Sequence, residues 1–238
     1  MKNIIVPIDF SIQSENALRV AASLARKHGS KIYALHMLEL NEAYITPVIK
    51  HYKVFSEVNE VAAANNADIV IMGSHGTDGL LEIFIGSNTE KVVRNSEIPV
   101  LVIKHGEKEF SPKTMVLACD LDEENIHAYQ RAKYIAAQFS AQLHVLYVNT
   151  PGDNFLSTED INDKVTKFSK ILGPEFLDVK IYNDYTVEKG VLNYAESQNI
   201  DVIGIPTHGR KGLSHFFMGS IGEDIANHSS IPVITFKI

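Results

Sequence analysis

The sequence predicts an α/β fold made of two tandem domains, each a parallel sheet flanked by helices. Three observations support this prediction. Short apolar runs such as Ile4–Ile8 alternate along the chain with segments whose apolar residues recur at helical spacing. The apolar runs are continuous rather than alternating, which is typical of strands buried on both faces of a sheet. The third observation is an internal repeat that extends over most of the 238 residues.

The repeat aligns the two halves of the chain in the same order. Residues 4–9 match residues 115–120 at an offset of 111. Further along, residues 68–71 match residues 201–204 at an offset of 133, and more pairs follow at the same offset. Chance can produce one such match but not an ordered series, so the sequence indicates a tandem duplication.

The boundary between the two copies falls in a polar stretch. Gly106 and Pro112 interrupt the chain there, after the last apolar run of the first copy. We therefore expect the first domain at residues 1–105 and the second at residues 113–238.

The elements of the first half can be assigned in chain order. A helix capped by Ser14 and ended by Gly29 should follow the first strand. A shorter helix is expected through Val58, Val61 and Ala62. The five strands are expected at residues 4–8, 32–38, 48–52, 69–72 and 99–103. Strands and helices in alternation imply a mostly parallel sheet with helices on both faces.

The second half is 22 residues longer than the first between its second and third strands. Residues 150–178 contain a helix pattern, opened by Ser157-x-x-Asp160 and closed by Gly173-Pro174. A crossover between parallel strands normally takes about 12 or more residues. Either the first half makes this connection without the helix, or a stretch of chain is missing after Leu40.

Composition and charge exclude several classes of protein. With a net charge of −7, the chain lacks the excess of Lys and Arg that is typical of general nucleic-acid and anionic-membrane binders. No run approaches the ~20 apolar residues that span a bilayer. Cys119 is the only cysteine, which excludes an intramolecular disulfide and a cysteine-rich metal cage. We expect a cytoplasmic protein that binds neither nucleic acid nor membrane.

The first candidate site segment is the end of the first strand, Val6-Pro7-Ile8-Asp9. Ligands of doubly wound sheets bind beyond the carboxyl ends of the strands. A carboxylate placed there by a buried strand can accept hydrogen bonds from ribose hydroxyls. A helix cap or a loop salt bridge is the alternative role for Asp9, and taken alone it is the more common one.

The second candidate segment follows the fourth strand. Gly73-Ser74-His75-Gly76 is followed, after nine residues, by Gly86-Ser87-Asn88-Thr89. Glycines let a backbone approach a polyphosphate, and hydroxyls at a helix start favour an anion. The alternative is structural, because Ser87-Asn88-Thr89-Glu90 is also a capping box that needs no ligand. His75 could contact phosphate or order the loop, and a histidine bonded to loop backbone is at least as common.

These segments together resemble the universal stress proteins (UspA family) in their tandem two-domain form. The residues that carry the resemblance are Val6–Ser11, Ile71–Gly76 and the G-x2-G-x9-G-S signature ending at Gly86-Ser87. The resemblance covers nearly the whole chain, once per half. It implies two Rossmann-like domains of the adenine nucleotide alpha hydrolase-like type. Each would be a five-stranded parallel sheet, and a pseudo-twofold axis would relate them.

The resemblance also implies an adenine nucleotide site in the first half, for ATP or AMP with or without Mg²⁺. Asp9 would contact the nucleoside, and Met37 would present its backbone to adenine. The residues that would surround the phosphates are Gly73, His75, Gly76, Gly86, Ser87, Asn88 and Thr89. In the second half, Pro206 and Gly222 replace Gly73 and Thr89, so we expect that site to be weaker or empty.

Two functions remain open. The first is a stress-response protein that senses an adenine nucleotide, and the second is a nucleotide-free module that binds a protein partner. Walker A, H-E-x-x-H and G-x-S-x-G motifs are absent. We therefore expect no enzyme, and at most slow ATP hydrolysis.

The resemblance finally implies how the halves meet. The last strands of the two halves, near residues 98–103 and 231–238, should pair antiparallel across the pseudo-twofold axis. Ordinary core packing within each half is the alternative. Such an intramolecular pseudo-dimer could pair further into a homodimer.

Overall fold

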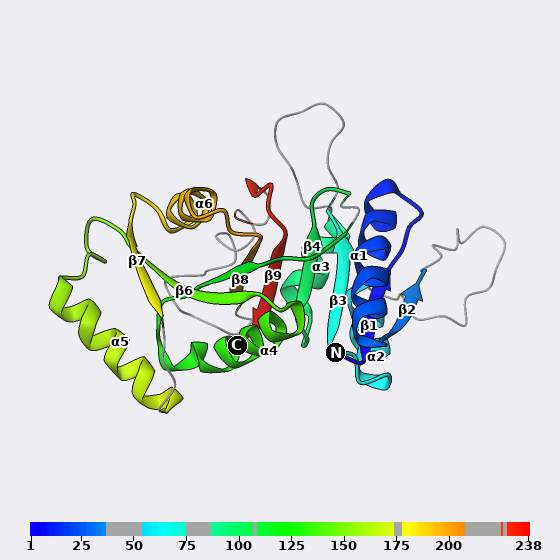
Figure 1. Cartoon of the computed structure of the whole chain (residues 1–238), viewed down its shortest axis with the longest axis horizontal. Helices are drawn as coiled ribbons and strands as arrows, with labels where there is room; N and C mark the ends of the chain where they lie inside the picture. The colour runs from blue at the N-terminus through cyan, green and yellow to red at the C-terminus, as the bar shows by residue number, and fades with distance from the viewer. Residues whose placement is uncertain (37–53, 75–86, 107–108, 174–177, 208–224, 226–227) are drawn as a thin grey trace, which may run out of the picture.

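The computed structural model describes residues 1–36, 54–74, 87–106, 109–173, 178–207, 225 and 228–238. Its centre is one nine-stranded sheet with the order β2-β1-β3-β4-β9-β8-β5-β6-β7 (Figure 1). Every neighbouring pair is parallel except β4–β9. The mostly parallel α/β prediction is therefore confirmed.

The first half contributes four described strands and three helices. In chain order these are β1 (Asn3–Pro7), α1 (Ile12–His28), β2 (Lys31–Leu35), α2 (Val54–Ala64), β3 (Ile69–Gly73), α3 (Ser87–Asn95) and β4 (Val100–Ile103). The strand expected at residues 48–52 and the shortened crossover lie outside the described residues.

The second half repeats this pattern with five strands. In chain order its elements are β5 (Thr114–Ala118), the 3-10 turn η1 (Glu123–Asn125), α4 (Ile126–Phe139), β6 (Gln142–Asn149), α5 (Thr158–Leu172), β7 (Val179–Asn183), α6 (Val187–Ser197), β8 (Val202–Thr207) and β9 (Val233–Lys237). The first strand of each half lies between two later strands of the same half: β1 between β2 and β3, and β5 between β6 and β8. This shared order is what the duplication predicts.

Helices cover both faces of the sheet. On one face a continuous core joins the two halves, and it includes Leu24 of α1, Phe139 of α4 and Phe168 of α5. On the other face, α2 and α3 pack on the first half, whereas α6 packs on the second. The inner strands β1, β3, β4, β5, β8 and β9 are almost completely buried, which explains their continuous apolar runs, whereas the outer strands β2 and β7 are partly exposed.

The two halves meet where β4 pairs antiparallel with β9, at the centre of the sheet (Figure 1). Leu101 lies opposite Ile234, and both side chains are fully buried. Further contacts cross the same boundary: Lys27 donates to the carbonyl of Phe139 at 3.0 Å, and Lys237 pairs with Glu97. The predicted antiparallel pairing of the last strands is confirmed.

Helix ends follow local sequence chemistry, with one correction. The expectation that Ser14 caps the first helix is wrong: Ser11 is the cap, and its Oγ accepts a hydrogen bond from the N–H of Ser14 at 3.2 Å. Gly29 ends the helix in the left-handed conformation, as expected. The capping box predicted for Ser157 and Asp160 forms at the start of α5.

None of the helices in the described part of the chain has both the length and the apolar character that crossing a membrane requires.

Candidate nucleotide site

A small cavity opens beyond the carboxyl ends of β1 and β3, where the sequence predicted a site. It has a volume of about 70 Å³. Segments far apart in the chain meet around it, since β1, the start of α1, the end of β3 and the start of α3 all contribute. Its lining residues are Pro7, Ile8, Asp9, Ser11, Gln13, Ser14, Met72, Gly73, Asn88 and Thr89.

Asp9 follows the buried strand β1 and is itself exposed. Its Oδ1 accepts hydrogen bonds from the backbone N–H of Ser11 at 3.0 Å and from the Ser11 hydroxyl at 2.6 Å. The carboxylate thus stabilises the turn into α1, which is the structural role considered for it. Because the side chain also lines the cavity and remains exposed, it can accept a further hydrogen bond from a ligand hydroxyl.

Gly73 ends β3 where the backbone of α1 comes very close. A Cβ atom at this position would lie 2.3 Å from the carbonyl oxygen of Gln13 and 2.7 Å from its Cβ. No real side chain fits there, so glycine is required by the packing of α1 on β3. Glycine is thus needed at position 73 for helix packing, a requirement that the spacing of the signature did not reveal.

The start of α3 supplies the other side of the cavity. The buried Thr89 hydroxyl donates to the carbonyl of Gly73 at 3.2 Å, which ties α3 to the end of β3. Its proton is therefore already used, and its oxygen can only accept. Asn88 is exposed and lines the cavity. Ser87 is the first residue of α3, and its side chain is not among those described.

Ser74 carries an unsatisfied polar atom next to Gly73. Its backbone N–H donates to the carbonyl of Ile103 at 2.9 Å, but its fully buried Oγ has no hydrogen-bond partner among the residues that the structure describes. An unpaired buried hydroxyl is uncommon and costs about 1–3 kcal/mol. It is a feature of the site that the sequence pattern did not single out.

Four predicted site residues lie outside the described residues. They are Met37, His75, Gly76 and Gly86. The structure therefore brings together Gly73, the first residue of the signature, Asn88–Thr89, which follow it directly, and Asp9. The middle of the signature stays a prediction.

In the second half, the carboxylate at the equivalent position is buried rather than exposed. Asp120, the counterpart of Asp9, is buried, and its Oδ1 accepts from the N–H of Asp122 at 3.1 Å and from the side-chain amide of Asn125. Burial raises the pKa of the Asp120 carboxyl above its ordinary value. Asp120 therefore holds its own loop together, whereas Asp9 is accessible.

The first helical turn also differs between the halves. The second half begins with the 3-10 turn η1 where the first half is already α-helical. Pro206, which stands where Gly73 stands, has the side chain that the close contact with Gln13 excludes in the first half. This difference agrees with the expectation that the two sites are unequal.

One feature of the first-half site was missed by the sequence reasoning. Phe10 has a φ of 64°, a conformation that residues other than glycine rarely adopt, and its side chain is 78% exposed. Its ring lies 4.6 Å from that of His36, which bonds the carbonyl of Ile8 through Nδ1 at 2.8 Å. Leu121, the counterpart of Phe10, shares the positive φ but is buried. An exposed aromatic ring thus stands beside Asp9 in the first half alone.

Within the described ranges, no cluster of three or more His, Cys, Asp or Glu side chains has the geometry to hold a metal ion. The single thiol, Cys119, is buried, and burial raises its pKa to about 12.

Comparison with protein families decides the classification. The model of the "Universal stress protein family" matches residues 1–53, 44–104 and 181–237, which together make up more than half of the chain. The chain belongs to the universal stress protein family. This confirms the resemblance drawn from Val6–Ser11 and the glycine signature.

Individual universal stress proteins are similar to parts of the chain. Universal stress protein MJ0531 of Methanocaldococcus jannaschii is 26% identical over 144 residues, which is 45% of this chain and 85% of that protein. Universal stress protein MJ0577 of the same organism is 50% identical over 48 residues, or 20% of this chain and 30% of that protein. Universal stress protein Slr1230 of Synechocystis is 24% identical over 172 residues, or 71% and 58%.

Solved structures confirm the fold over the whole chain. A universal stress protein from Archaeoglobus fulgidus has a TM-score of 0.70 at 22% identity, covering 99% of this chain and 98% of that one. A putative universal stress protein from Pseudomonas aeruginosa has a TM-score of 0.62 at 18% identity, covering 99% and 82%. The Rossmann-like α/β fold in two halves is therefore shown.

Proposed function

We propose that this universal stress protein binds an adenine nucleotide, ATP or AMP, at the first-half site and acts as a sensor or regulatory binding protein. The observation that carries the proposal is the meeting of Asp9, Gly73 and Asn88 around one cavity at the carboxyl edge of the sheet. The exposed Asp9 carboxylate would accept from the ribose hydroxyls. The start of α3 would face the phosphates, where free amides favour negative charge.

The unpaired hydroxyl of Ser74 supports the same proposal. It is a buried group next to the glycine signature with an unused hydrogen-bonding capacity. The exposed ring of Phe10 offers a nearby apolar surface for a nucleobase. The second half combines a buried Asp120 with Pro206, so we propose one occupied site per chain.

A second function has its own observation. The described cavity of about 70 Å³ is well below the ~300 Å³ at which ligand pockets usually begin. This favours the alternative in which the chain is a nucleotide-free module that binds a protein partner. We rank it second because Asp9, Gly73 and Asn88 still converge on the cavity.

We further propose that the protein binds nucleotide without efficient turnover. The Gly-Lys-Ser/Thr loop of a fast phosphotransferase and the G-x-S-x-G nucleophile motif are absent from the sequence. Release of phosphate from ATP, followed with a colorimetric assay, is expected to be slow or undetectable. Rapid hydrolysis that is lost in Asp9→Asn would contradict this view and make the protein an enzyme.

Calorimetric titration of nucleotide-stripped protein with Mg-ATP and with AMP tests the proposal. We expect close to one nucleotide per chain and a roughly tenfold weaker affinity for Asp9→Asn, since a charge-assisted hydrogen bond is replaced. The matched control is Asp120→Asn, which changes the equivalent residue of the other half and should leave affinity unchanged.

Two outcomes would reverse the ranking. If neither nucleotide gives heat, and native mass spectrometry finds no co-purified ligand, the partner-binding module becomes the better account. If Asp120→Asn weakens binding and Asp9→Asn does not, the occupied site lies in the second half.

A further inference from the structure

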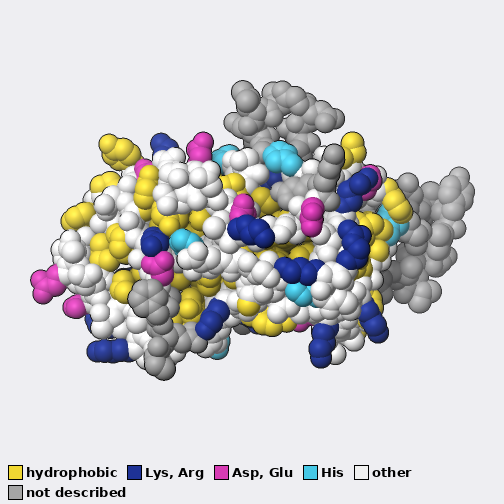
Figure 2. Space-filling view, in the orientation of Figure 1, with side chains coloured by type: hydrophobic (Ala, Val, Ile, Leu, Met, Phe, Trp, Pro, Cys, Tyr) yellow, Lys and Arg dark blue, Asp and Glu magenta, His cyan; other side chains and the backbone are white. Residues whose placement is uncertain are grey.

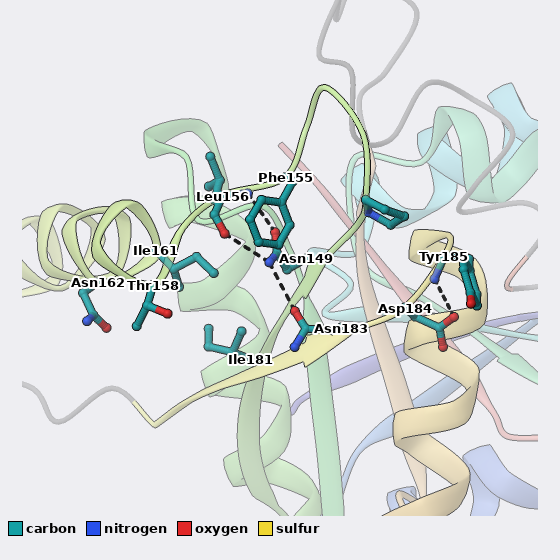
Figure 3. A pocket seen from close by; sticks show the side chains of 11 residues that line it. Asn149, Phe155, Leu156, Thr158, Ile161, Asn162, Ile181, Asn183, Asp184 and Tyr185 are labelled. Carbon is teal, nitrogen blue, oxygen red and sulfur yellow. Dashed lines mark hydrogen bonds between the residues drawn. The ribbon is translucent and has the colours of Figure 1, made fainter.

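A larger cleft lies at the far end of the second half, away from the candidate nucleotide site. It has a volume of about 660 Å³ and lies between the ends of β6 and β7, the loop after β6 and the first turn of α5 (Figure 3). This volume is within the ~300–1,000 Å³ typical of ligand sites. No function considered so far uses it.

Internal hydrogen bonds hold the wall of the cleft in place. The buried side chain of Asn149 accepts from the N–H of Leu156 at 3.0 Å and donates to its carbonyl at 3.2 Å. The same amide donates to Oδ1 of Asn183 at 3.2 Å, which joins the loop to the end of β7 (Figure 3). A cleft shaped by such bonds is pre-formed, so little ordering is needed on binding.

Exposed apolar side chains concentrate around this cleft. Phe155 is 60%, Ile181 41% and Tyr185 81% exposed, and all three line it. Ile171 on α5 is a further exposed residue of the same end of the molecule, at 50%. Figure 2 shows hydrophobic side chains over the end that α5, β7 and α6 form. Patches of this kind commonly mark interaction sites.

The cleft adjoins an unpaired sheet edge. Among the described strands, β7 is the last of the sheet and pairs only with β6. Side chains along a strand alternate between its two faces, and Ile181 and Asn183 both line the cleft. A strand added beside β7 would place its own alternate side chains over the same face.

The charges around the cleft select against anions. No Lys, Arg or His is among the described residues that line it, and each oxygen of Asp184 already accepts a hydrogen bond, from the N–H of Tyr185 at 2.6 Å or the Asn193 amide at 2.8 Å. Two exposed acidic residues stand next to lining residues in the chain: Asp153 in the loop after β6 and Glu159 in the first turn of α5. A phosphate would be repelled here, whereas a basic group would be attracted.

We propose that β7 and this cleft form a docking site for an extended, basic peptide segment of a partner protein. The segment would pair with the outer edge of β7 through main-chain hydrogen bonds, as in other strand-addition complexes. One apolar side chain would insert between Phe155 and Ile181 as the anchor. A neighbouring Lys or Arg of the peptide would face Asp153 and Glu159. The Oδ1 of Asn183 accepts from Asn149, and its Nδ2 would donate to a peptide carbonyl.

The test selects random twelve-residue peptides displayed on phage against the immobilised full-length chain. The most enriched peptide is then synthesised with a fluorophore, and its binding is measured by fluorescence anisotropy. We expect apolar residues at alternate positions with Lys or Arg between them. Affinity should fall at least tenfold for Ile181→Asp and for Phe155→Ser. The matched control, Ile171→Asp, alters an equally exposed isoleucine that does not line the cleft and should change affinity less than twofold.

N-methylation of alternate peptide amides separates strand addition from simple pocket binding, and it should abolish binding. Thermal unfolding of each variant confirms that the fold is kept. Asp9→Asn should bind the peptide as well as the unaltered chain does, so failure of the nucleotide proposal leaves this test intact.

Several results would overturn the proposal. These are no enrichment over a blocked surface, selection of acidic peptides, or binding that survives Ile181→Asp or N-methylation. Sedimentation that shows a dimer broken by Ile181→Asp would also overturn it, because the occupant of the edge would then be a second copy of this chain.

Discussion

At the residue scale, Gly73 shows how one missing Cβ atom permits the geometry of the first-half site. The backbone of Gln13 occupies the space where a side chain would stand, so α1 can approach the end of β3. That approach places Asp9 and the start of α3 around one cavity. The packing of α1 on β3 and the shape of the candidate site thus both depend on the absence of a Cβ atom at Gly73.

Gly73→Ala should therefore be more costly than an ordinary glycine substitution. We expect the free energy of unfolding, measured with urea, to fall by ~3 kcal/mol or more because a Cβ atom at 2.3 Å forces the backbone apart. The control is Gly29→Ala, where φ is +67° but no atom lies within 4 Å, and a loss of only ~1–2 kcal/mol is expected. Equal losses in the free energy of unfolding for the two variants would show that α1 can shift away from β3 at little cost.

Lys104 gives a prediction on pH dependence. It follows β4, is only 7% exposed, and burial lowers the pKa of its ammonium group from the ordinary 10.5 to about 8. Between pH 8 and 10.5 the folded lysine is neutral while the unfolded one is still protonated. The unfolded state then binds more protons, so the free energy of unfolding should rise with pH across this window, by ~1–3 kcal/mol.

Lys104→Met removes the titrating group and keeps an unbranched apolar side chain. The variant should be more stable than the unaltered chain at pH 7, and the difference should shrink as the pH approaches 10. Urea unfolding of both proteins at pH 7, 8, 9 and 10 measures it. A difference in the free energy of unfolding that stays constant from pH 7 to 10 would mean that the buried ammonium of Lys104 does not cause the pH dependence.

At the element scale, the cap of α1 joins helix stability to the site. The hydroxyl of Ser11 accepts from the N–H of Ser14 and donates to the Asp9 carboxylate at 2.6 Å. In the second half, Ser157 caps α5 without any link to a candidate nucleotide site. The two serines therefore have the same capping role in different surroundings.

Ser11→Ala and Ser157→Ala should each lower the free energy of unfolding by ~1 kcal/mol, because each removes a helix cap. Only Ser11→Ala should also weaken nucleotide binding, since it releases the carboxylate of Asp9. Urea unfolding and calorimetric titration of both variants give the comparison. An equal effect of the two on affinity would argue against Asp9 as a nucleotide ligand.

At the scale of the whole molecule, the two halves share one sheet and one continuous core. Leu101 and Ile234 face each other across the β4–β9 pairing, and both are fully buried. The rings of Phe110, in the connection, and Phe139, in α4, pack edge to face at 5.4 Å. Burial on this scale should make the halves unfold together.

Leu101→Ala should accordingly destabilise both halves. We expect a loss of about 2–5 kcal/mol from the cavity left in the core, with one cooperative transition retained. Hydrogen exchange should speed up in α5 of the second half as well as in α1 of the first. Faster exchange confined to the first half would show that the halves unfold as separate units.

Much of the architecture could be predicted from the sequence, for identifiable reasons. Continuous apolar runs specify strands buried on both faces, and the repeat specifies two copies of one topology. The boundary of α1 was placed wrongly because Ser11 and Ser14 are both good caps, and only the backbone path after Asp9 selects between them.

The candidate site was predictable to the extent that it depends on chain order. Asp9 follows β1, Gly73 ends β3 and Asn88 lies in the first turn of the helix that comes after β3, so all three lie at the carboxyl edge of the sheet. Sequence reasoning could not find the contact that requires Gly73 to be glycine or the use of the Thr89 proton by a carbonyl, because both depend on how closely α1 and α3 approach β3.

By itself, then, the sequence determined the duplicated α/β fold and the place of the glycine signature. These properties follow from periodicity and local chemistry. Only the tertiary structure decided that Asp9 is exposed while Asp120 is buried, and that Phe155, Ile181 and Tyr185 gather beside β7, the last of the described strands in the sheet. Exposure and convergence depend on what packs against each residue, and that is set by contacts between segments far apart in the chain.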